Sequence, residues 1–441
     1  MTKKELQQKQ IGVISLGCDK NRVDTEHVLG LLTQYGFKIT NNIEEANIII
    51  INTCSFILDA RTESMEAILE SINYKTSKCE KVIVMGCLTQ MGISEIKADF
   101  PEIDAFVKLK ENKDIVDIIE GLYGLNTGFK PLNLPPNRIV STPKHYAYLK
   151  IADGCNNACA YCTIPAIRGR FKSEPIEVLV EEAKALVAKG VKELILVAQD
   201  TTRYGLDLYK KPKLVELIKE LSKIDGLKWI RLHYCYPEMV SDELIDEVAN
   251  NKKVCKYIDI PLQHISDKVL KAMNRRSSKE SIETLINKIR SKNKDITIRS
   301  TFIVGFPGET RKDYKQLYNF LNDYKLNYVG FFPYSREPKT AAYNMKKQVP
   351  TFIKMHRLNK LQKLQESVLL QHNEAQIGKE CIVLCNDYLS EQNYYVGRSE
   401  HTSAEVDTLI LFKSSKPLKI GEFYTVKITN LMGYDLEGEV L

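Results

Sequence analysis

Long apolar runs are absent from this sequence of 441 residues. A helix that crosses a membrane needs about 20 consecutive apolar residues, whereas the apolar stretches here, such as residues 48–51, are only long enough for buried strands. The first five residues are polar and lack the apolar core of a secretory signal peptide. We therefore expect a protein that has no membrane anchor and is located in the cytoplasm.

Compositional bias is absent as well. Apolar residues make up 44% and charged residues 27% of the chain, which is ordinary for a globular protein and excludes a disordered chain, a collagen-like chain and a small disulfide scaffold. The sequence has no internal repeat and no low-complexity tract. At about 150 residues per domain, its length suggests about three domains. The net charge of +7 is small for such a chain, so it is only weak evidence for a polyanionic partner.

The first region of the chain alternates buried strands with amphipathic helices. Residues 11–16, 48–51 and 82–85 are rich in Ile and Val and are typical of buried parallel strands. This pattern predicts an N-terminal domain over residues 9–125 with an open parallel α/β sheet. Between the strands, apolar residues recur at the i, i+3, i+4, i+7 spacing of one helix face: Val28, Leu31, Leu32 and Tyr35, then Met65, Ile68, Leu69 and Ile72.

Two further domains are expected after a proline-rich stretch over residues 124–143, which indicates a linker. Six consecutive βα units predict a partial (βα)6 TIM-like barrel within residues 141–371. A connecting helix is expected over residues 351–376. Short β-type runs with Gly and Asp turns then predict a small antiparallel β-barrel over residues 374–441, so the overall class is α/β. The strand candidates of the central domain are residues 146–151, 193–198, 229–234, 256–260, 296–304 and 328–332.

Cysteine, in contrast, is plentiful, with 11 residues. Because cytosolic thiols stay reduced, we expect metal ligands, catalytic groups or core residues rather than disulfides. Cys155, Cys159 and Cys162 form a C-x3-C-x2-C triplet directly after the first strand of the central domain. Three thiolates can bind three irons of a 4Fe–4S cubane and leave the fourth iron open for a small chelating ligand. The alternative, a structural zinc site, needs four ligands, and no fourth Cys or His lies nearby in the sequence.

A second set of cysteines follows the three N-terminal strands. Cys18, Cys54 and Cys87 are separated from one another by about one βα unit. The carboxyl ends of parallel strands meet at one edge of a sheet, where ligands usually bind, so these thiols can converge on a second cluster with an open iron. The alternative is three separate buried thiols. For the other five cysteines we expect core packing: Cys79, Cys235, Cys255, Cys381 and Cys385.

The triplet, with Tyr161 before its last cysteine, is similar to the signature of the radical S-adenosylmethionine superfamily. Both sets of cysteines together resemble the methylthiotransferase family of that superfamily over essentially the whole chain. The resemblance implies an N-terminal domain with an auxiliary cluster, a radical S-adenosylmethionine core and a C-terminal TRAM domain. It also implies two 4Fe–4S clusters held by the six cysteines, and S-adenosylmethionine as methyl source and radical initiator. The implied cofactor contacts are Tyr161, Gln199, Gln263 and Gly305, and no general acid or base is assigned.

Members of this family divide by substrate into a transfer-RNA branch and a ribosomal-protein branch. Residues 374–441 contain 6 Lys and Arg against 11 Asp and Glu, a net charge of −5 that leaves +12 on the rest of the chain. A domain that binds RNA should be basic, whereas an acidic domain is complementary in charge to a basic ribosomal protein. The alternative is that the acidic side chains only form a solvated surface and indicate no partner. Residues 197–205, 396–400 and 433–440 also resemble the ribosomal-protein branch.

The resemblance therefore implies methylthiolation of the β-carbon of an aspartate on the small-subunit ribosomal protein numbered twelve. It also implies a reduced low-potential electron donor such as flavodoxin or ferredoxin as a partner. Methylthiolation of an adenosine in transfer RNA is the alternative within the family. A different class also accounts for the cysteines, namely a non-catalytic iron–sulfur protein that stores electrons or binds RNA.

Overall fold

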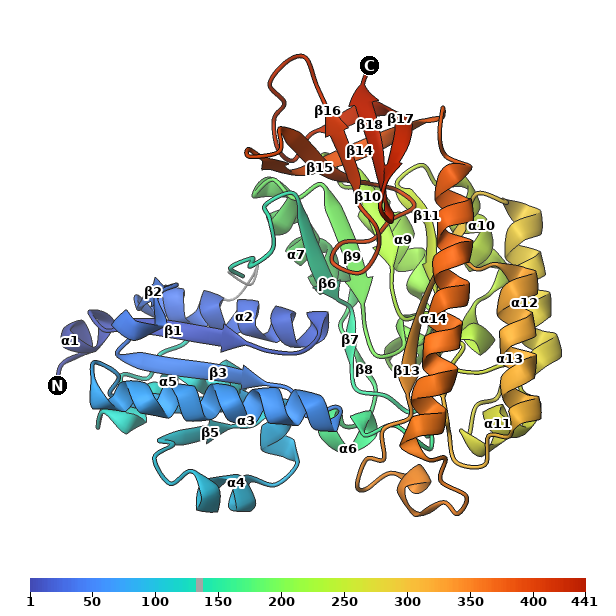
Figure 1. The fold of residues 1–441 in the computed structure, drawn as a ribbon. Helices are drawn as coiled ribbons and strands as arrows, with labels where there is room; N and C mark the ends of the chain where they lie inside the picture. Colours follow the sequence, from blue (N-terminus) through green and yellow to red (C-terminus); the bar gives the residue numbers. More distant parts are fainter. Residues whose placement is uncertain (132–137) are drawn as a thin grey trace.

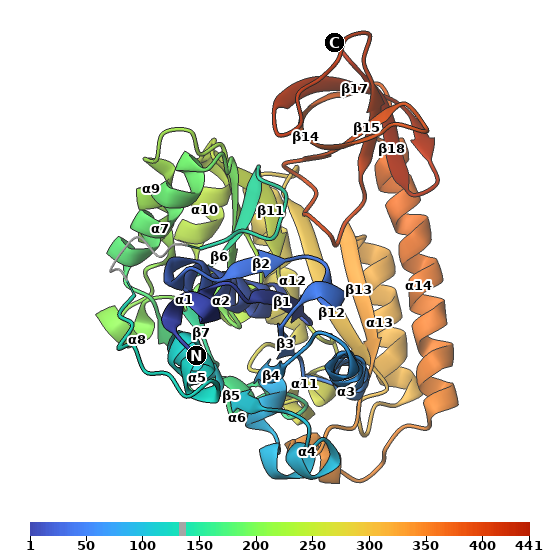
Figure 2. The same ribbon diagram turned by 90° about the vertical axis from the view of Figure 1, so that its left-hand side faces the viewer.

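The computed structural model describes residues 1–131 and 138–441 of the chain (Figure 1). Two parallel sheets, each covered by helices, lie side by side, and a barrel of strands sits at one end of the second sheet (Figures 1 and 2). Across the described ranges, no helix is both long and apolar enough to pass through a membrane. The domain limits 9–125, 141–371 and 374–441 stay predictions, and the predicted linker lies partly outside the described residues.

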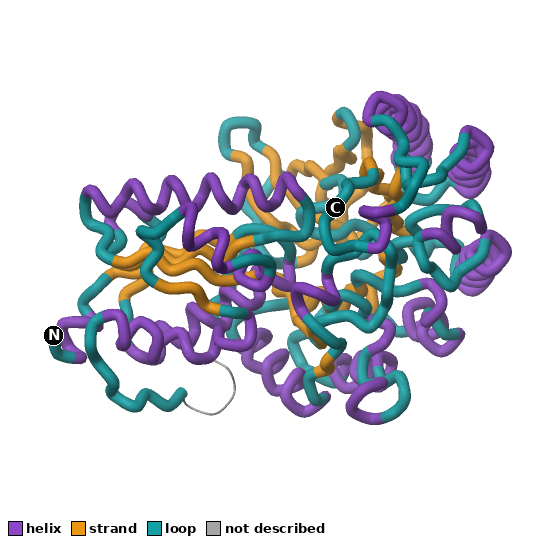
Figure 3. Tube along the Cα trace, turned by 90° about the horizontal axis from the view of Figure 1, so that it is seen from below, coloured by secondary structure: helices purple, strands orange, loops and turns teal. Residues whose placement is uncertain are grey.

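The N-terminal sheet has five parallel strands in the order β2-β1-β3-β4-β5. Ile48 and Ile50 of the third strand in the chain pack on one side of the sheet, and Ile49 and Ile51 pack on the other. Helices cover both faces (Figure 3), which explains why this strand is apolar throughout. The strands are β1 (Gln10–Ser15), β2 (Lys38–Thr40), β3 (Ile48–Thr53), β4 (Lys81–Gly86) and β5 (Ala105–Val107).

The predicted open α/β sheet is therefore confirmed, and the structure adds two edge strands. Both β2 and β5 have only three residues, too few to give a recognisable apolar pattern. The two predicted amphipathic helices are α2 (Asp19–Tyr35) and α3 (Leu58–Asn73). The remaining helices of this part are α1 (Lys3–Gln7), α4 (Ile93–Asp99) and α5 (Ile115–Leu122).

The central sheet has six parallel strands in the order β13-β12-β11-β10-β9-β6, which is the chain order reversed. Such an order is that of an open, partial barrel built from successive βα units, as predicted. Leu194 and Leu196 pack against the outer helices, whereas Ile195 and Val197 point to the inner face. The strands are β6 (Tyr146–Lys150), β9 (Glu193–Val197), β10 (Trp229–Leu232), β11 (Val254–Asp259), β12 (Thr297–Val304) and β13 (Tyr328–Pro333).

Helices of the central part lie along the outer face of this sheet (Figure 1). Between β6 and the first long helix, the chain also forms a short hairpin of β7 (Ala152–Asp153) and β8 (Lys172–Ser173), which holds the loop with the C-x3-C-x2-C triplet. The helices are α6 (Ile164–Arg168), α7 (Ile176–Ala188), α8 (Leu206–Tyr209), α9 (Leu214–Ser222), α10 (Asp242–Asn250), α11 (Asp267–Ala272), α12 (Lys279–Lys292), α13 (Arg311–Tyr324) and α14 (Thr351–Glu374).

The C-terminal strands close into a barrel in the order β14-β15-β16-β18-β17. Most neighbouring strands are antiparallel, as predicted, but β16 and β18 pair in parallel and close the barrel. The sequence analysis missed β18, because it has only two apolar side chains, Leu436 and Val440, among three acids and a glycine. The strands are β14 (Glu380–Leu389), β15 (Tyr394–Ser399), β16 (Ile410–Lys413), β17 (Phe423–Met432) and β18 (Asp435–Val440).

A loop of this barrel, residues 400–409, is inserted against the inner face of the central sheet (Figures 1 and 2). Its Ala404 is buried among Val23 of the N-terminal part and Tyr146 and Tyr148 of β6. Its Glu405 accepts hydrogen bonds from Tyr146 and from the guanidinium of Arg22. The loop thus joins all three parts of the chain, and it extends along the inner face of the central sheet as far as His233, directly after β10, which is hydrogen-bonded to Ser403.

Candidate active site at two thiol triads

The structure brings together Cys18, Cys54 and Cys87, here called the N-terminal triad. They follow β1, β3 and β4, whose carboxyl ends lie at one edge of the sheet. A Cβ atom on Gly17 would lie 2.8 Å from the Cβ of Cys54, so the loops that carry Cys18 and Cys54 are in contact. All three are free thiols. The pKa of Cys87 is raised to about 12, chiefly by burial; Arg168 acts against this rise, and the neighbouring Cys18 and Cys54 add to it.

Buried polar side chains hold the loops of the N-terminal triad. Ser64 of α3 accepts a hydrogen bond from the backbone N–H of Cys54 and donates one to its carbonyl. Asn21 donates to the carbonyl of Leu16, and Asn52 donates to the carbonyl of Asn21. The sequence analysis gave none of these polar residues a role. A buried Asn at the end of an apolar strand, as at Asn52, is the signal that could have identified one of them.

The central triad consists of Cys155, Cys159 and Cys162, which lie in the loop between β7 and α6. Gly154 has a φ of +76°, and a Cβ atom there would lie 2.3 Å from the carbonyl oxygen of Arg170. Only glycine fits this close approach of two backbone segments. The loop closes where the N–H of Cys155 donates to the carbonyl of Gly169.

Side chains from later strands support the central triad. Asn157 donates to the carboxylate of Asp200, which follows β9 and is fully buried. The hydroxyl of Tyr236, after β10, lies 3.6 Å from the Sγ of Cys159. Burial raises the pKa of Cys162 to about 12, and the neighbouring thiols act in the same direction. The three cysteines therefore sit in a shared, partly desolvated environment at the carboxyl ends of the central strands.

Neither triad is arranged as a site for one metal ion. Over residues 1–131 and 138–441, no group of three or more His, Cys, Asp or Glu side chains is placed to hold a single ion. In a cubane each thiolate binds a different iron, so its ligands do not have to meet at one point. Each set of three free thiols therefore fits a 4Fe–4S cubane. One iron of each cubane would be left open for another ligand.

The four residues predicted to contact the cofactor lie around the central triad or at nearby strand ends. Gln199 donates to Asp153 through its amide nitrogen, and its buried oxygen has no hydrogen-bond partner within residues 1–131 and 138–441. Gln263 has a φ of +71°, which is strained for a residue other than glycine. Gly305 donates its N–H to the carboxylate of Glu309. Their roles stay predictions. Tyr161 packs beside Ala160 and Phe306, and burial, followed by the charge of Cys159, raises its pKa well above the ordinary value.

Arg275 is a residue of this site that the sequence analysis missed. Its side chain is buried, and its Cζ lies over the ring of Tyr236, 3.8 Å from the ring centroid. Its Nη2 donates to the carbonyl of Pro261, whereas its Nε is buried without a hydrogen-bond partner among the described residues. A buried guanidinium with a free donor beside the central triad fits a carboxylate or another anionic group of a bound ligand. No local motif marks this residue, because only the fold brings it to the triad.

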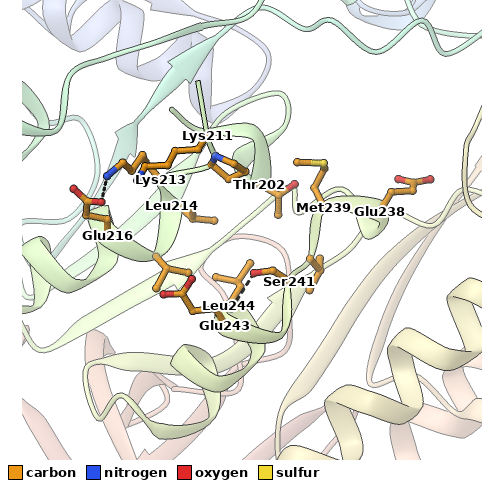
Figure 4. A pocket seen from close by; sticks show the side chains of 13 residues that line it. Thr202, Lys211, Lys213, Leu214, Glu216, Glu238, Met239, Ser241, Glu243 and Leu244 are labelled. Atoms are coloured by element: carbon orange, nitrogen blue, oxygen red, sulfur yellow. Dashed lines mark hydrogen bonds and ion pairs between the residues drawn. The ribbon is translucent and has the colours of Figure 1, made fainter. Parts of the chain in front are cut away.

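A surface pocket of about 440 Å³ lies elsewhere, against α9 and α10 on the outside of the central sheet (Figure 4). Its wall mixes charges of both signs, including Lys211, Glu238 and Glu243, and Lys213 forms an ion pair with Glu216 on one side of it. The six cysteines lie outside this wall. The pocket is therefore not the candidate active site.

Family models match the chain in three consecutive segments. The Radical SAM superfamily matches residues 149–321, the Uncharacterized protein family UPF0004 matches residues 10–108, and the TRAM domain matches residues 377–441. The radical S-adenosylmethionine methyltransferase TsrM of Kitasatospora setae has the same fold over 76% of this chain and 77% of its own, with a TM-score of 0.57 at 14% identity. At this identity the likeness shows the fold alone.

Curated relatives match over nearly the full length. The ribosomal protein uS12 methylthiotransferase RimO of Acetivibrio thermocellus is 46% identical, and the match covers 98% of each chain. The protein of the same name from Clostridium botulinum is 48% identical, again over 98% of each chain. With this identity over nearly its whole length, the chain belongs to the RimO family of ribosomal protein uS12 methylthiotransferases, within the radical S-adenosylmethionine superfamily.

Proposed function

We propose that this chain attaches a methylthio group to the β-carbon of an aspartate in ribosomal protein uS12. The observation that carries the proposal is the identity of 44–48% over 97% or more of the chain to relatives that bear this enzyme name. Two thiol triads at strand ends supply the ligand sets that such chemistry needs. Membership of the superfamily implies one 4Fe–4S cluster and S-adenosylmethionine, and the second cluster is part of the proposal.

Each triad has its own task in this scheme. The central triad holds the cluster at which S-adenosylmethionine binds, and the N-terminal triad holds an auxiliary cluster. When bound, these cofactors supply hydrogen-atom abstraction from an unactivated carbon and the methyl and sulfur groups. Gln199 and Arg275 supply the polar contacts that orient the cofactor, because each has a buried polar atom without a hydrogen-bond partner in the part of the chain that the structure describes.

The remaining parts of the chain shape access to the site. The loop over residues 400–409 covers part of the inner face of the central sheet, so substrate reaches the triads from the side that this loop leaves open. Three of the 11 acids of the C-terminal segment, Glu405, Asp407 and Glu422, form ion pairs within the protein. Others remain at the surface and suit a basic ribosomal protein by charge complementarity: Glu380, Asp387, Glu391 and Glu439. A cytoplasmic location and a flavodoxin or ferredoxin as electron donor complete the proposal.

The substrate is tested by incubating the anaerobically purified enzyme, S-adenosylmethionine and a reductant with isolated uS12 or with transfer RNA. We expect a methylthio mass gain on one aspartate of uS12, because the acidic barrel favours a basic protein over a polyanion. Mass spectrometry of both substrates provides the measurement. A mass gain on transfer RNA alone would contradict the proposed substrate, and release of no deoxyadenosine in either reaction would contradict the enzymatic function.

Replacing Cys18, Cys54 and Cys87 together by alanine separates the two tasks. We expect this variant to keep cleavage of S-adenosylmethionine, to lose about half of its iron, and to form no methylthiolated product. Chromatography of deoxyadenosine, iron analysis and mass spectrometry of uS12 measure these three quantities. Cys79→Ala is the matched control, because Cys79 is a buried thiol of the same part of the chain and lies outside the triad. Full iron content in the triple variant would refute the second cluster.

A further inference from the structure

The side chain of Arg168 connects the two triads. It stands at the end of α6, six residues after Cys162, and its side chain is 1% exposed. Its Nη2 lies 3.6 Å from the Sγ of Cys87 and donates a hydrogen bond to it. Cys87 belongs to the N-terminal triad, so a residue of the central part of the chain reaches directly into the other cluster site.

The same guanidinium is held in place by two carboxylates. Its Nη1 lies 2.9 Å from Asp24 and 2.9 Å from Asp153. Lys150 forms ion pairs with both of these carboxylates as well. The Nη2 atom also donates to the side-chain oxygen of Asn21 at 3.1 Å. Two cations and two carboxylates thus form a compact network, in which the guanidinium of Arg168 contacts the Sγ of Cys87.

The network lies next to a cysteine of each triad. Asp153 directly precedes the Gly154–Cys155 pair of the central triad, and Asp24 lies on α2, whose first turn follows Cys18. Movement of either loop would break charge-assisted hydrogen bonds, which are among the strongest in proteins. The network therefore links the loops that carry the two triads.

We propose that Arg168 is a positioning residue that sets the reduction potential of the auxiliary cluster through its hydrogen bond to Cys87. This inference rests on the proposed function, because it requires a cluster at the N-terminal triad. Donors to cluster sulfur and nearby positive charge stabilise the reduced, more negative cluster and raise its potential. Arg168 supplies both in a site from which water is largely excluded, where electrostatic interactions are strong.

The test uses the full chain with Cys155, Cys159 and Cys162 replaced by alanine, so that only the auxiliary cluster loads. Redox titration followed by electron paramagnetic resonance measures its midpoint potential with Arg168, with Arg168→Gln and with Arg168→Lys. We expect a midpoint shifted to more negative values in Arg168→Gln and a smaller shift in Arg168→Lys, which keeps the charge but not the planar fork. Arg170→Gln is the matched control, because Arg170 is exposed two residues further on, and its midpoint should not move.

An unchanged midpoint in a fully loaded Arg168→Gln variant would overturn the inference while leaving the proposed function intact. If Arg168→Gln does not fold, the midpoint potential of Arg168→Lys provides the test. An unchanged midpoint potential in Arg168→Lys would also overturn the inference. A protein with the native Arg168 that binds no cluster at the N-terminal triad would overturn the proposed function and this inference together. Equal shifts in the Arg168 and Arg170 variants would show a general charge effect and would also refute the specific role.

Discussion

Replacing Cys155, Cys159 and Cys162 together by alanine is expected to abolish cleavage of S-adenosylmethionine. In the proposed function, these three thiolates hold three irons of a cubane and the fourth iron binds the cofactor, so their loss removes the site of electron transfer itself. With the two cubanes of the proposal, the iron content should fall from about eight to about four per chain, the number that remains in one cubane. Deoxyadenosine, measured by chromatography after anaerobic reduction, should fall below detection, and methylthiolation of uS12 should disappear with it.

Cys235→Ala is the matched control for this triple variant. Cys235 is a fully buried thiol that follows β10 and packs in the central core, so its replacement costs some stability but should leave both clusters loaded. A triple variant that retained all of its iron, or that still released deoxyadenosine at the normal rate, would show that the central triad is not the site of the radical cluster.

Replacing Glu193 by glutamine is expected to destabilise the protein by about 3–5 kcal/mol. Glu193 of β9 lies between Arg231 of β10, at 2.7 Å, and Arg398 of the C-terminal barrel, at 2.6 Å, and all three side chains are 0% exposed. Removal of the carboxylate leaves two buried guanidinium groups without a counter-ion, which is a costly arrangement. Glu193, Arg231 and Arg398 together connect the C-terminal barrel to the central sheet. Loss of the carboxylate should therefore weaken the contact between the barrel and the sheet first.

The single tryptophan of the chain reports on this junction. Trp229 of β10 packs edge-on against Phe423 of the barrel, with ring centroids 4.8 Å apart. Urea unfolding followed by tryptophan fluorescence should therefore show a lower midpoint in Glu193→Gln. In the control Glu181→Gln, which removes an exposed ion pair with Lys184, the stability should change by at most about 0.5 kcal/mol. Equal midpoints in the two variants would contradict the role of the buried group.

The contribution of Glu193 also depends on pH. Burial alone would raise the pKa of Glu193, but the guanidinium groups of Arg398 and Arg231 lower it from 4.5 to about 2. Because the pKa is lower in the folded protein than in the unfolded chain, this stabilisation is fully present above about pH 4.5 and is lost as the pH falls toward 2. The gap in urea midpoint between the native protein and Glu193→Gln should therefore narrow over that range.

Local sequence patterns were sufficient to predict the main elements and to single out both sets of cysteines as candidate ligands. Strands such as β3 and β9 are short apolar runs, and helices such as α2 repeat apolar residues every three to four positions, so each can be recognised within its own segment. The cysteines were found for the same reason, since three lie within eight residues and the others follow strands whose carboxyl ends must meet. Elements of two or three residues, such as β7 and β5, carry too little pattern to be recognised.

Contacts between distant segments were decided only by the tertiary structure. Arg168 lies 81 positions from Cys87 in the sequence, and Glu193 lies 205 positions from Arg398, and neither pair belongs to a local motif. A charged residue in a sequence is expected at the surface, because burial of an unpaired charge is costly. Only the folded chain shows that opposite charges from separate parts meet in the interior, where they hold the two triads and the barrel in place.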